Sequence, residues 1–116
     1  MARHVVVGSG GIGQATAAAL VEAGHEVVIA SRSGVGPDLP GVRRVAVEAT
    51  DARALTTLAE GAASLVNAVN PPTYTHWERD WPPMAAAFLA AARASGSGLV
   101  TIGNLYGYGP VDGPLV

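Results

Sequence analysis

The chain has 116 residues, enough for one domain, and 49% of them are hydrophobic while 14% are charged, a composition that favours a buried core over disorder. The formal net charge is −2, no basic run occurs, and no apolar stretch approaches the roughly 20 residues of a membrane span, so neither a nucleic-acid nor a membrane partner is expected. The absence of cysteine excludes disulfides and thiolate chemistry and leaves a cytoplasmic location as the default expectation.

The first half of the chain alternates between strand and helix patterns. An apolar, β-branched run at residues 4–7 predicts a buried strand, and residues 8–13 form a glycine turn. Residues 14–23 predict a helix, and residues 26–30 predict a second strand. Residues 33–41 contain three glycines and two prolines and therefore predict a loop.

The same alternation continues in the second half. A third strand is predicted at residues 42–47, and Asp51 can cap a helix that runs to about residue 60. A fourth strand at residues 64–69 stops at an Asn-Pro-Pro sequence that cannot continue it. Trp-Pro-Pro then precedes a helix at residues 84–94, a fifth strand follows at residues 98–102, and glycine and proline predict a loop beyond it.

Strands separated by helices predict a parallel sheet with right-handed crossovers and helices on both faces. For five strands we expect the spatial order 3-2-1-4-5, the doubly wound α/β arrangement known as the Rossmann fold, filling residues 1–116 as one domain. Because the fifth strand has no covering neighbour in this chain, we expect an exposed apolar edge and a tendency to form homodimers.

A G-x-G-x-x-G pattern joins the first predicted strand to the first predicted helix, the context in which this pattern binds a dinucleotide. Gly8 permits the tight turn, Gly10 lets the backbone approach a pyrophosphate, and Gly13 lets the helix pack closely on the sheet. The free N–H groups and the dipole of the helix would stabilise the phosphate charge. The candidate pyrophosphate-binding residues are Gly8, Gly10, Gly11, Ile12 and Gly13.

The end of the second predicted strand indicates which nucleotide is bound. Domains that bind NAD usually carry Asp or Glu about 20 residues after the glycine loop, where it binds the ribose 2′-hydroxyl. Here Ser31 and Arg32 occupy that strand end instead. Arg32 can pair with a 2′-phosphate and Ser31 can add a hydrogen bond, which favours NADP(H) over the alternative, NAD(H).

Residues 5–32 resemble the cofactor-binding start of extended and atypical short-chain dehydrogenases, the NAD-dependent epimerase/dehydratase group. Residues 41–55 resemble the third strand, acidic residue and following helix of that group, and residues 100–110 resemble its fifth strand and Tyr-Gly tail. The resemblance implies a small-molecule substrate and hydride transfer at a carbon that bears oxygen. It also implies that Glu48 and Ala49 contact adenine and that the nicotinamide ribose is flanked by Asn67, Ala68, Val69 and Asn70.

Two departures from the group's pattern concern catalysis. Asn104 stands where the group usually has a Ser or Thr that polarises the substrate carbonyl, with Thr101 three residues earlier, so both are candidate catalytic residues. The Tyr-x-x-x-Lys pair of the group is absent, because the chain has no lysine to complete it. We therefore expect either part of a longer enzyme, without its substrate-binding portion, or a protein that binds nucleotide and performs no hydride chemistry alone.

Two other interpretations stay open. A non-catalytic NADP(H) sensor fits the missing pair, and a saccharopine-dehydrogenase-like oxidoreductase fits the Gly-Gly-Ile-Gly loop and the Ala-Ser-Arg strand end, although the Tyr-Gly-Pro tail counts against it. No metal site is expected, because the three histidines share no ligand spacing. His4 and His25 fall at the opposite end of the predicted sheet from the glycine loop, and we expect them to be surface residues.

Overall fold

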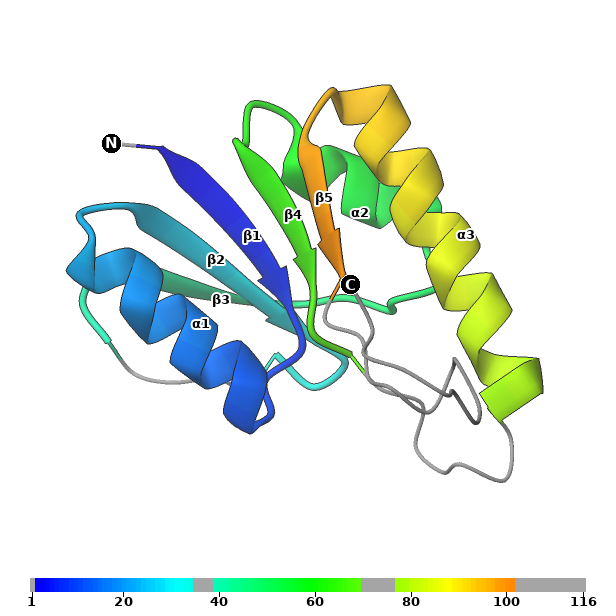
Figure 1. The fold of residues 1–116 in the computed structure, drawn as a ribbon, viewed down its shortest axis with the longest axis horizontal. Helices are drawn as coiled ribbons and strands as arrows, with labels where there is room; N and C mark the ends of the chain where they lie inside the picture. The colour runs from blue at the N-terminus through cyan, green and yellow to red at the C-terminus, as the bar shows by residue number, and fades with distance from the viewer. Residues whose placement is uncertain (1, 35–38, 70–76, 102–116) are drawn as a thin grey trace, which may run out of the picture.

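The computed structural model describes residues 2–34, 39–69 and 77–101. Its five strands form one parallel sheet in the order β3-β2-β1-β4-β5, which confirms the predicted topology (Figure 1). The strands are β1 (Arg3–Val7), β2 (Glu26–Ser31), β3 (Val42–Ala46), β4 (Ser64–Asn67) and β5 (Gly98–Thr101). The central strand, β1, pairs through Val5 with Val28 of β2 and with Leu65 of β4.

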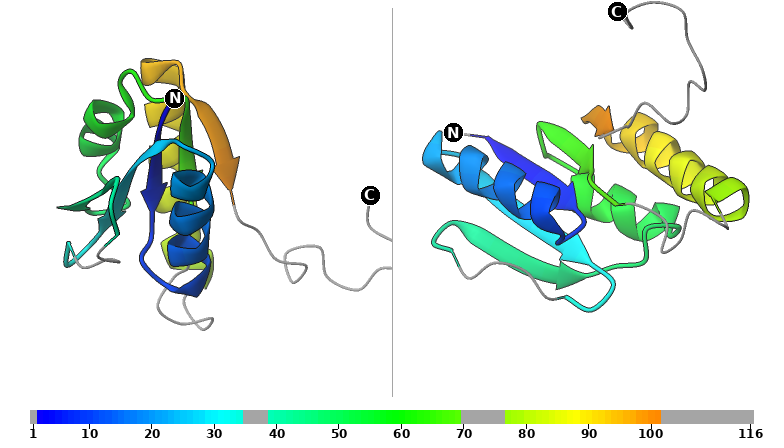
Figure 2. Two further views of the ribbon diagram at one scale, coloured as in Figure 1. Left: turned by 90° about the vertical axis from the view of Figure 1, so that its left-hand side faces the viewer. Right: turned by 60° about the horizontal axis from the view of Figure 1, so that its bottom comes forward.

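Helices cover both faces of the sheet, as the strand patterns predicted (Figures 1 and 2). They are α1 (Gly11–Glu22), α2 (Ala52–Ala59) and α3 (Trp77–Ser95). On the face under α1, Ala17 of the helix packs with Val6 of β1 and Ile29 of β2. The face under α2 and α3 carries the larger apolar cluster, which includes Leu55 and Phe88. Successive residues of β1 therefore contribute to opposite layers, the alternation that a strand buried on both faces requires.

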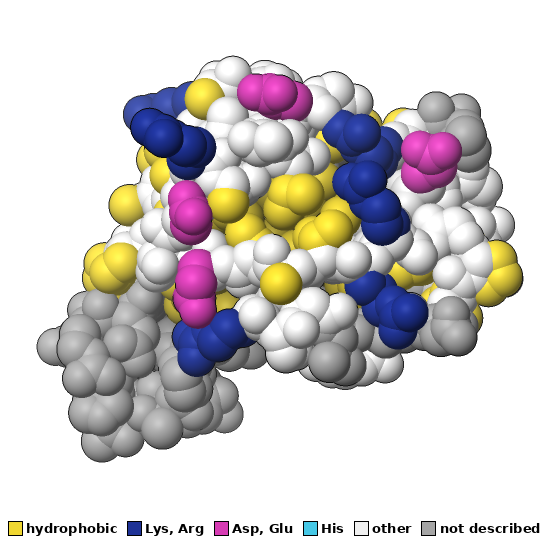
Figure 3. Space-filling view, turned by 180° about the vertical axis from the view of Figure 1, so that it is seen from behind, with side chains coloured by type: hydrophobic (Ala, Val, Ile, Leu, Met, Phe, Trp, Pro, Cys, Tyr) yellow, Lys and Arg dark blue, Asp and Glu magenta, His cyan; other side chains and the backbone are white. Residues whose placement is uncertain are grey.

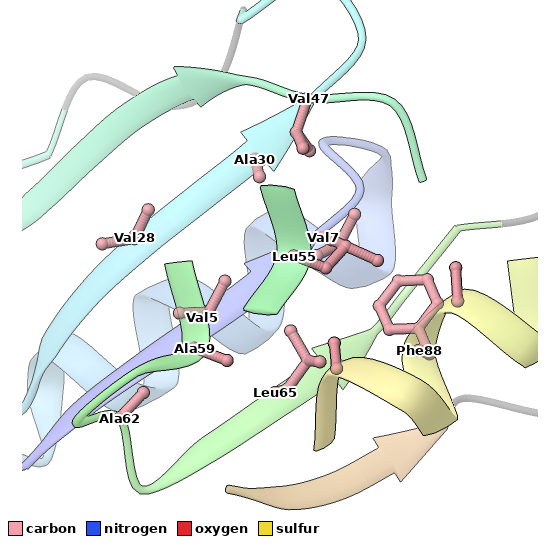
Figure 4. Packing of buried hydrophobic residues seen from close by; sticks show 12 residues of the cluster. Val5, Val7, Val28, Ala30, Val47, Leu55, Ala59, Ala62, Leu65 and Phe88 are labelled. Carbon is pink, nitrogen blue, oxygen red and sulfur yellow. The ribbon is translucent and has the colours of Figure 1, made fainter. Parts of the chain in front are cut away.

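The larger cluster brings together one large side chain each from β1, α2 and α3. Phe88 of α3, Leu55 of α2 and Val7 of β1 are each no more than 1% exposed and gather above the middle of the sheet (Figure 4). Full burial of one such side chain stabilises the fold by about 1.5–3 kcal/mol. This cluster thus fixes α2 and α3 against the strand from which the glycine turn leaves.

The largest differences from the predicted boundaries are at the starts of α1 and α3 and at the end of β4. α1 begins at Gly11 rather than at residue 14, because the Gln14 amide already donates a helical hydrogen bond of 2.9 Å to the Gly10 carbonyl. α3 begins at Trp77 rather than at residue 84 and contains two prolines. Proline inside a helix lacks the amide donor and crowds the carbonyl four residues earlier, which is why the sequence predicts that the helix begins only after the two prolines.

The fourth strand is shorter than predicted because its last side chain turns the chain. The Asn67 side-chain oxygen accepts a hydrogen bond of 3.0 Å from the Val69 amide, which bends the backbone out of the sheet at residue 67 instead of residue 69. The predicted cap of α2 is confirmed, since the Ala54 amide donates to the Asp51 carboxylate at 3.1 Å.

The prediction that His4 and His25 are simple surface residues was wrong. Both are half-buried, and their ring centroids lie 4.8 Å apart in an edge-to-face arrangement. The His4 Nδ1 atom also lies 2.6 Å from the Ser64 hydroxyl oxygen. Their position at the amino ends of β1 and β2 is as predicted, but three chain segments converge there and cover the rings.

Two apolar features of the described surface are left uncovered. β5 is an edge strand in the described part of the chain, and its Leu99 and Val100 side chains are 37% and 47% exposed, as the expected apolar edge requires. On the face shown in Figure 3, hydrophobic side chains are visible between basic ones. A shallow groove of about 410 Å³ runs between β3 and α2 and is lined by Val45, Ala46, Val47, Asp51, Arg53, Ala54, Thr57 and Leu58. Self-association stays a prediction.

None of the described helices is long and apolar enough to cross a membrane.

We predict that Ser97→Ala destabilises the fold by about 1–3 kcal/mol, because it removes a buried hydroxyl donor that lies within hydrogen-bond distance of two carbonyl oxygens. Ser97 is buried, and its hydroxyl lies 2.7 Å from the Ala59 carbonyl and 2.9 Å from the Ala62 carbonyl, where it ties the end of α2 to the start of β5. Urea unfolding measures the change. Thr57→Ala, which removes an exposed hydroxyl from the same helix, is the control. Equal losses in the two variants would refute the role of Ser97.

We also predict that stability falls as the pH drops below about 6.5. Burial lowers the pKa of His4 below its ordinary value of 6.5, and the charge of His25 lowers it further. The unfolded chain therefore binds a proton more readily than the folded chain, so the His4 contribution is complete above pH 6.5 and is lost as the pH falls through the lowered pKa. Urea midpoints recorded between about pH 8 and about pH 5 should show this decline. His4→Gln should flatten it, and an unchanged pH profile in that variant would contradict the assignment.

Candidate functional site

The carboxyl ends of the parallel strands meet at one edge of the sheet, and this edge carries the glycine turn. In sheets of this kind a ligand binds in the crevice where the strand order reverses, which here lies between β1 and its neighbour β4. Gly8 follows β1 directly, Ser31 ends β2, and Asn67 ends β4. The topology therefore brings together segments that lie far apart in the sequence.

Gly8 and Gly13 are required by the fold itself. Gly8 has a φ of +115°, and a Cβ atom there would lie 2.7 Å from the Ala68 carbonyl oxygen. A Cβ atom at Gly13 would lie 2.0 Å from the Gly8 carbonyl oxygen, so the first turn of α1 can rest on the glycine turn only without a side chain at this position. The tight turn and the close helix packing predicted for these two glycines are both present.

Gly10 and Gly11 stand in a different environment. Among the described residues, no atom outside the adjoining backbone lies within 4 Å of a Cβ atom placed at either residue, so no described contact requires glycine there. Gly10 caps α1 with extended backbone and no side-chain hydrogen bond, and the first helical turn holds no acidic residue. Ile12, in the same turn, is 53% exposed. The space in front of these amides has room for an anion. The partial positive charge of the helix N-terminus would attract an anion to it.

A cavity of about 270 Å³ adjoins the glycine turn. Its walls are formed by Val7, Gly8, Ser31, Arg32, Val47, Glu48, Ala49, Thr50, Val69 and Met84. Six of these residues, namely Gly8, Ser31, Arg32, Glu48, Ala49 and Val69, were predicted site residues. The carboxyl ends of β1, β2 and β3 thus place the residues expected around the adenosine portion of a dinucleotide beside the head of α1.

Four residues of the cavity were not predicted as site residues. Val7 and Val47 are the last buried apolar residues before their chain segments leave the sheet, a position that a strand pattern alone could have indicated. Thr50 lies next to the predicted acidic segment. Met84 had no signal in the sequence, because only the packing of α3 brings it to the cavity.

Arg32 and Glu48 form an ion pair at the mouth of this cavity. The Arg32 Nε atom lies 3.0 Å from a carboxylate oxygen of Glu48, and the side chains are 77% and 54% exposed. Sequence reasoning had given them separate tasks, with Arg32 at the 2′-phosphate and Glu48 at adenine. An ion pair so exposed contributes about 1 kcal/mol at most, so a ligand can replace it.

The exit of β4 is held by hydrogen bonds. Asn67 is only 1% exposed, and its side chain supports the turn by accepting from the Val69 amide. The Ala68 amide donates to the Val7 carbonyl at 2.8 Å. Asn67 therefore shapes the segment predicted to pass the nicotinamide ribose, while Asn70 lies outside the described residues.

Of the two candidate catalytic residues, only one falls in the described part of the chain. Thr101 ends β5, is exposed, and pairs in register with Asn67 of β4, which places it on the same sheet edge as the glycine turn. Asn104 lies outside the described residues. Within residues 2–34, 39–69 and 77–101, no group of three His, Asp or Glu side chains could hold a metal ion.

Comparison with solved structures gives likenesses in fold. Uronate dehydrogenase from Agrobacterium tumefaciens, complexed with NAD, matches with a TM-score of 0.71 and 22% identity over 87% of this chain. An oxidoreductase from Lactococcus lactis matches with a TM-score of 0.77 and 14% identity over 95% of it. The Bordetella bronchiseptica enzyme WbmG, in complex with NAD and UDP, matches with a TM-score of 0.69 and 18% identity over 86%.

The chain spans 40%, 51% and 36% of the lengths of these three structures, respectively. No protein-family model and no curated protein sequence matches the chain. The chain therefore shares the fold of part of each of these three structures, which include a dehydrogenase and an oxidoreductase.

We predict that alanine at two glycines of the loop has opposite effects on folding and binding. Gly10→Ala places a methyl group in open space, so the urea midpoint should stay near that of the wild type, while binding of a dinucleotide weakens about tenfold or more. Gly13→Ala forces the helix from the turn and should destabilise the protein by more than about 2 kcal/mol. Urea unfolding and calorimetric titration separate the two effects. Full binding by a well-folded Gly10→Ala variant would argue against a ligand at this turn.

Proposed function

We propose that this chain binds NADP(H), with NAD(H) as the alternative, as the nucleotide-binding portion of an oxidoreductase or epimerase of the epimerase/dehydratase type. The observation that carries the proposal is the open space in front of Gly10 and Gly11 at the head of α1, next to a cavity that contains Arg32. No described residue lies close to the missing side chain of Gly10, and this leaves room for a ligand to approach the backbone there.

In this proposal the pyrophosphate lies at the first turn of α1. The amides of Gly11, Ile12 and Gly13 belong to that turn, and a helix terminus stabilises phosphate through such amides and its dipole. The exposed Ile12 side chain would be covered by the bound dinucleotide. The adenosine portion enters the neighbouring cavity, where Val7 and Val47 supply apolar walls for the base.

Arg32 supports NADP(H) as the ligand. It stands at the end of β2, where an acidic residue would bind the hydroxyls of NAD, and its guanidinium can make a bidentate, charge-assisted contact with a 2′-phosphate. The ribose side of the cavity also contains Ser31. NAD(H) stays the alternative because the uronate dehydrogenase and WbmG structures contain NAD.

A bound nicotinamide dinucleotide would accept or donate a hydride, which gives oxidation or reduction at a carbon that bears oxygen. The residues of this chain would position it. The buried Asn67 shapes the β4 exit beside the nicotinamide ribose, and the exposed Thr101 hydroxyl on the same edge can donate a hydrogen bond to a substrate carbonyl oxygen. A small molecule is therefore the proposed substrate, with Asn104 as a second candidate donor.

A non-catalytic NADP(H) sensor is the second proposal. The glycine loop and the cavity support it equally, because both serve to bind a nucleotide and neither requires turnover. It shares the site described above and differs in its outcome, because a sensor binds the nucleotide without turnover even when the chain is part of a longer protein.

We predict that calorimetric titration of the purified chain detects binding of NADPH that is tighter than binding of NADH. Arg32→Ala should weaken NADPH binding about tenfold or more, the loss expected for a hydrogen bond to a charged group, and change NADH binding less. Arg93→Ala, which removes an exposed arginine from the last turn of α3, is the matched control and should leave both affinities unchanged.

Two results would count against this function. If neither nucleotide binds to the wild-type chain, the chain alone is not a dinucleotide-binding unit. If both bind and Arg32→Ala leaves the ratio of their affinities unchanged, Arg32 does not contact the 2′-phosphate. The preference for NADP(H) over NAD(H) is then refuted.

A further inference from the structure

The ends of β2 and β3 are locked side by side just before the Arg32–Glu48 pair. The Val47 amide donates a hydrogen bond of 2.8 Å to the Ser31 carbonyl, which continues the pairing of β2 with β3 beyond Ala46. Arg32 and Glu48 each follow one partner of this bond. The sheet pairing therefore places the backbones of Arg32 and Glu48 next to each other, and their side chains form an ion pair of 3.0 Å at the rim of the cavity.

This arrangement places opposite charges where the two forms of a dinucleotide differ. The ribose of NAD offers hydroxyl donors, which a carboxylate accepts, whereas NADP carries a 2′-phosphate there, which needs donors and positive charge. The Glu48 carboxylate can accept a hydrogen bond from a ribose hydroxyl and repels a 2′-phosphate, whereas the positive charge of Arg32 attracts the phosphate. A site that contains both side chains can therefore bind either NAD or NADP.

The exposure of the pair decides how it responds to a ligand. Arg32 and Glu48 are 77% and 54% exposed, so water competes with their contact and breaking it is easy. The contact with Glu48 engages the Nε atom of a guanidinium that has five N–H donors in all. A 2′-phosphate can therefore either bind Arg32 together with Glu48 or displace Glu48 from Arg32. In both cases the Glu48 carboxylate weakens phosphate binding, because it competes for the guanidinium and repels the phosphate.

We propose that Glu48 is a specificity-determining residue, which sets the preference between NADP(H) and NAD(H) by holding Arg32 in an ion pair that a 2′-phosphate must share or break. The proposal rests on the dinucleotide-binding function proposed above. Arg32 alone would select strongly for NADP(H). With Glu48 as its partner the preference is moderate, and the site accepts both coenzymes.

The test is a titration series with NADPH, NADH, adenosine 2′,5′-bisphosphate and AMP against the wild type, Glu48→Gln, Arg32→Gln and the double variant. Glu26→Gln is the control for net charge, because Glu26 is an exposed carboxylate at the other end of β2. Glu48→Gln should raise the ratio of NADPH to NADH affinity about threefold to tenfold, through tighter NADPH binding. The two adenosine fragments should show the same shift, which assigns it to the ribose pocket.

The double variant separates the ion pair from simple repulsion. If Glu48 acts through Arg32, the gain from Glu48→Gln is smaller when Arg32 is already Gln. An equal gain in both backgrounds, an unchanged ratio in Glu48→Gln, or the same shift in Glu26→Gln would each overturn the proposal. If the wild type binds NADPH and NADH but the ratio does not move, only this inference fails. If it binds neither, the proposed function fails as well.

Discussion

The contact between the first turn of α1 and the glycine turn is the constraint on which the rest of the structure depends. The Gly13 backbone rests so close to the Gly8 carbonyl that a side chain would overlap it, and Gly8 itself lies against the backbone at Ala68. Through these two approaches α1, β1 and the exit of β4 form one rigid junction. The amino end of α1 is thereby aimed at the sheet edge where the strand order reverses, and this is the geometry that an anionic ligand needs.

The two ends of the sheet differ in the kind of contact that their polar side chains make. The amino edge holds contacts that serve the fold, such as the half-buried ring of His4 against His25 and the Ser97 hydroxyl between the Ala59 and Ala62 carbonyls. The carboxyl edge holds the exposed ion pair, the open backbone at Gly10 and the cavity. The contacts at the first edge join the described strands and helices to one another, whereas the groups at the second edge are open to solvent, as those of a ligand site are.

Charge at the carboxyl edge is balanced across two strands. Arg32 would by itself make the cavity strongly favourable for phosphate, but Glu48 meets it across the end of the β2–β3 pairing. In the proposed site, coenzyme preference would then depend on a pair of residues rather than on one strand end. Sequence rules that inspect only the end of the second strand consider Arg32 and omit the carboxylate that arrives from the third.

The sequence by itself determined the order and type of the strands, the cap at Asp51 and the tasks of Gly8 and Gly13, because periodicity, capping and glycine geometry are local properties of neighbouring residues. Only the tertiary structure decided which distant residues meet. The Arg32–Glu48 contact, the place of Met84 in the cavity and the burial of His4 each depend on how strands and helices pack. Such contacts join segments far apart in the chain, and no local pattern encodes their separation in space.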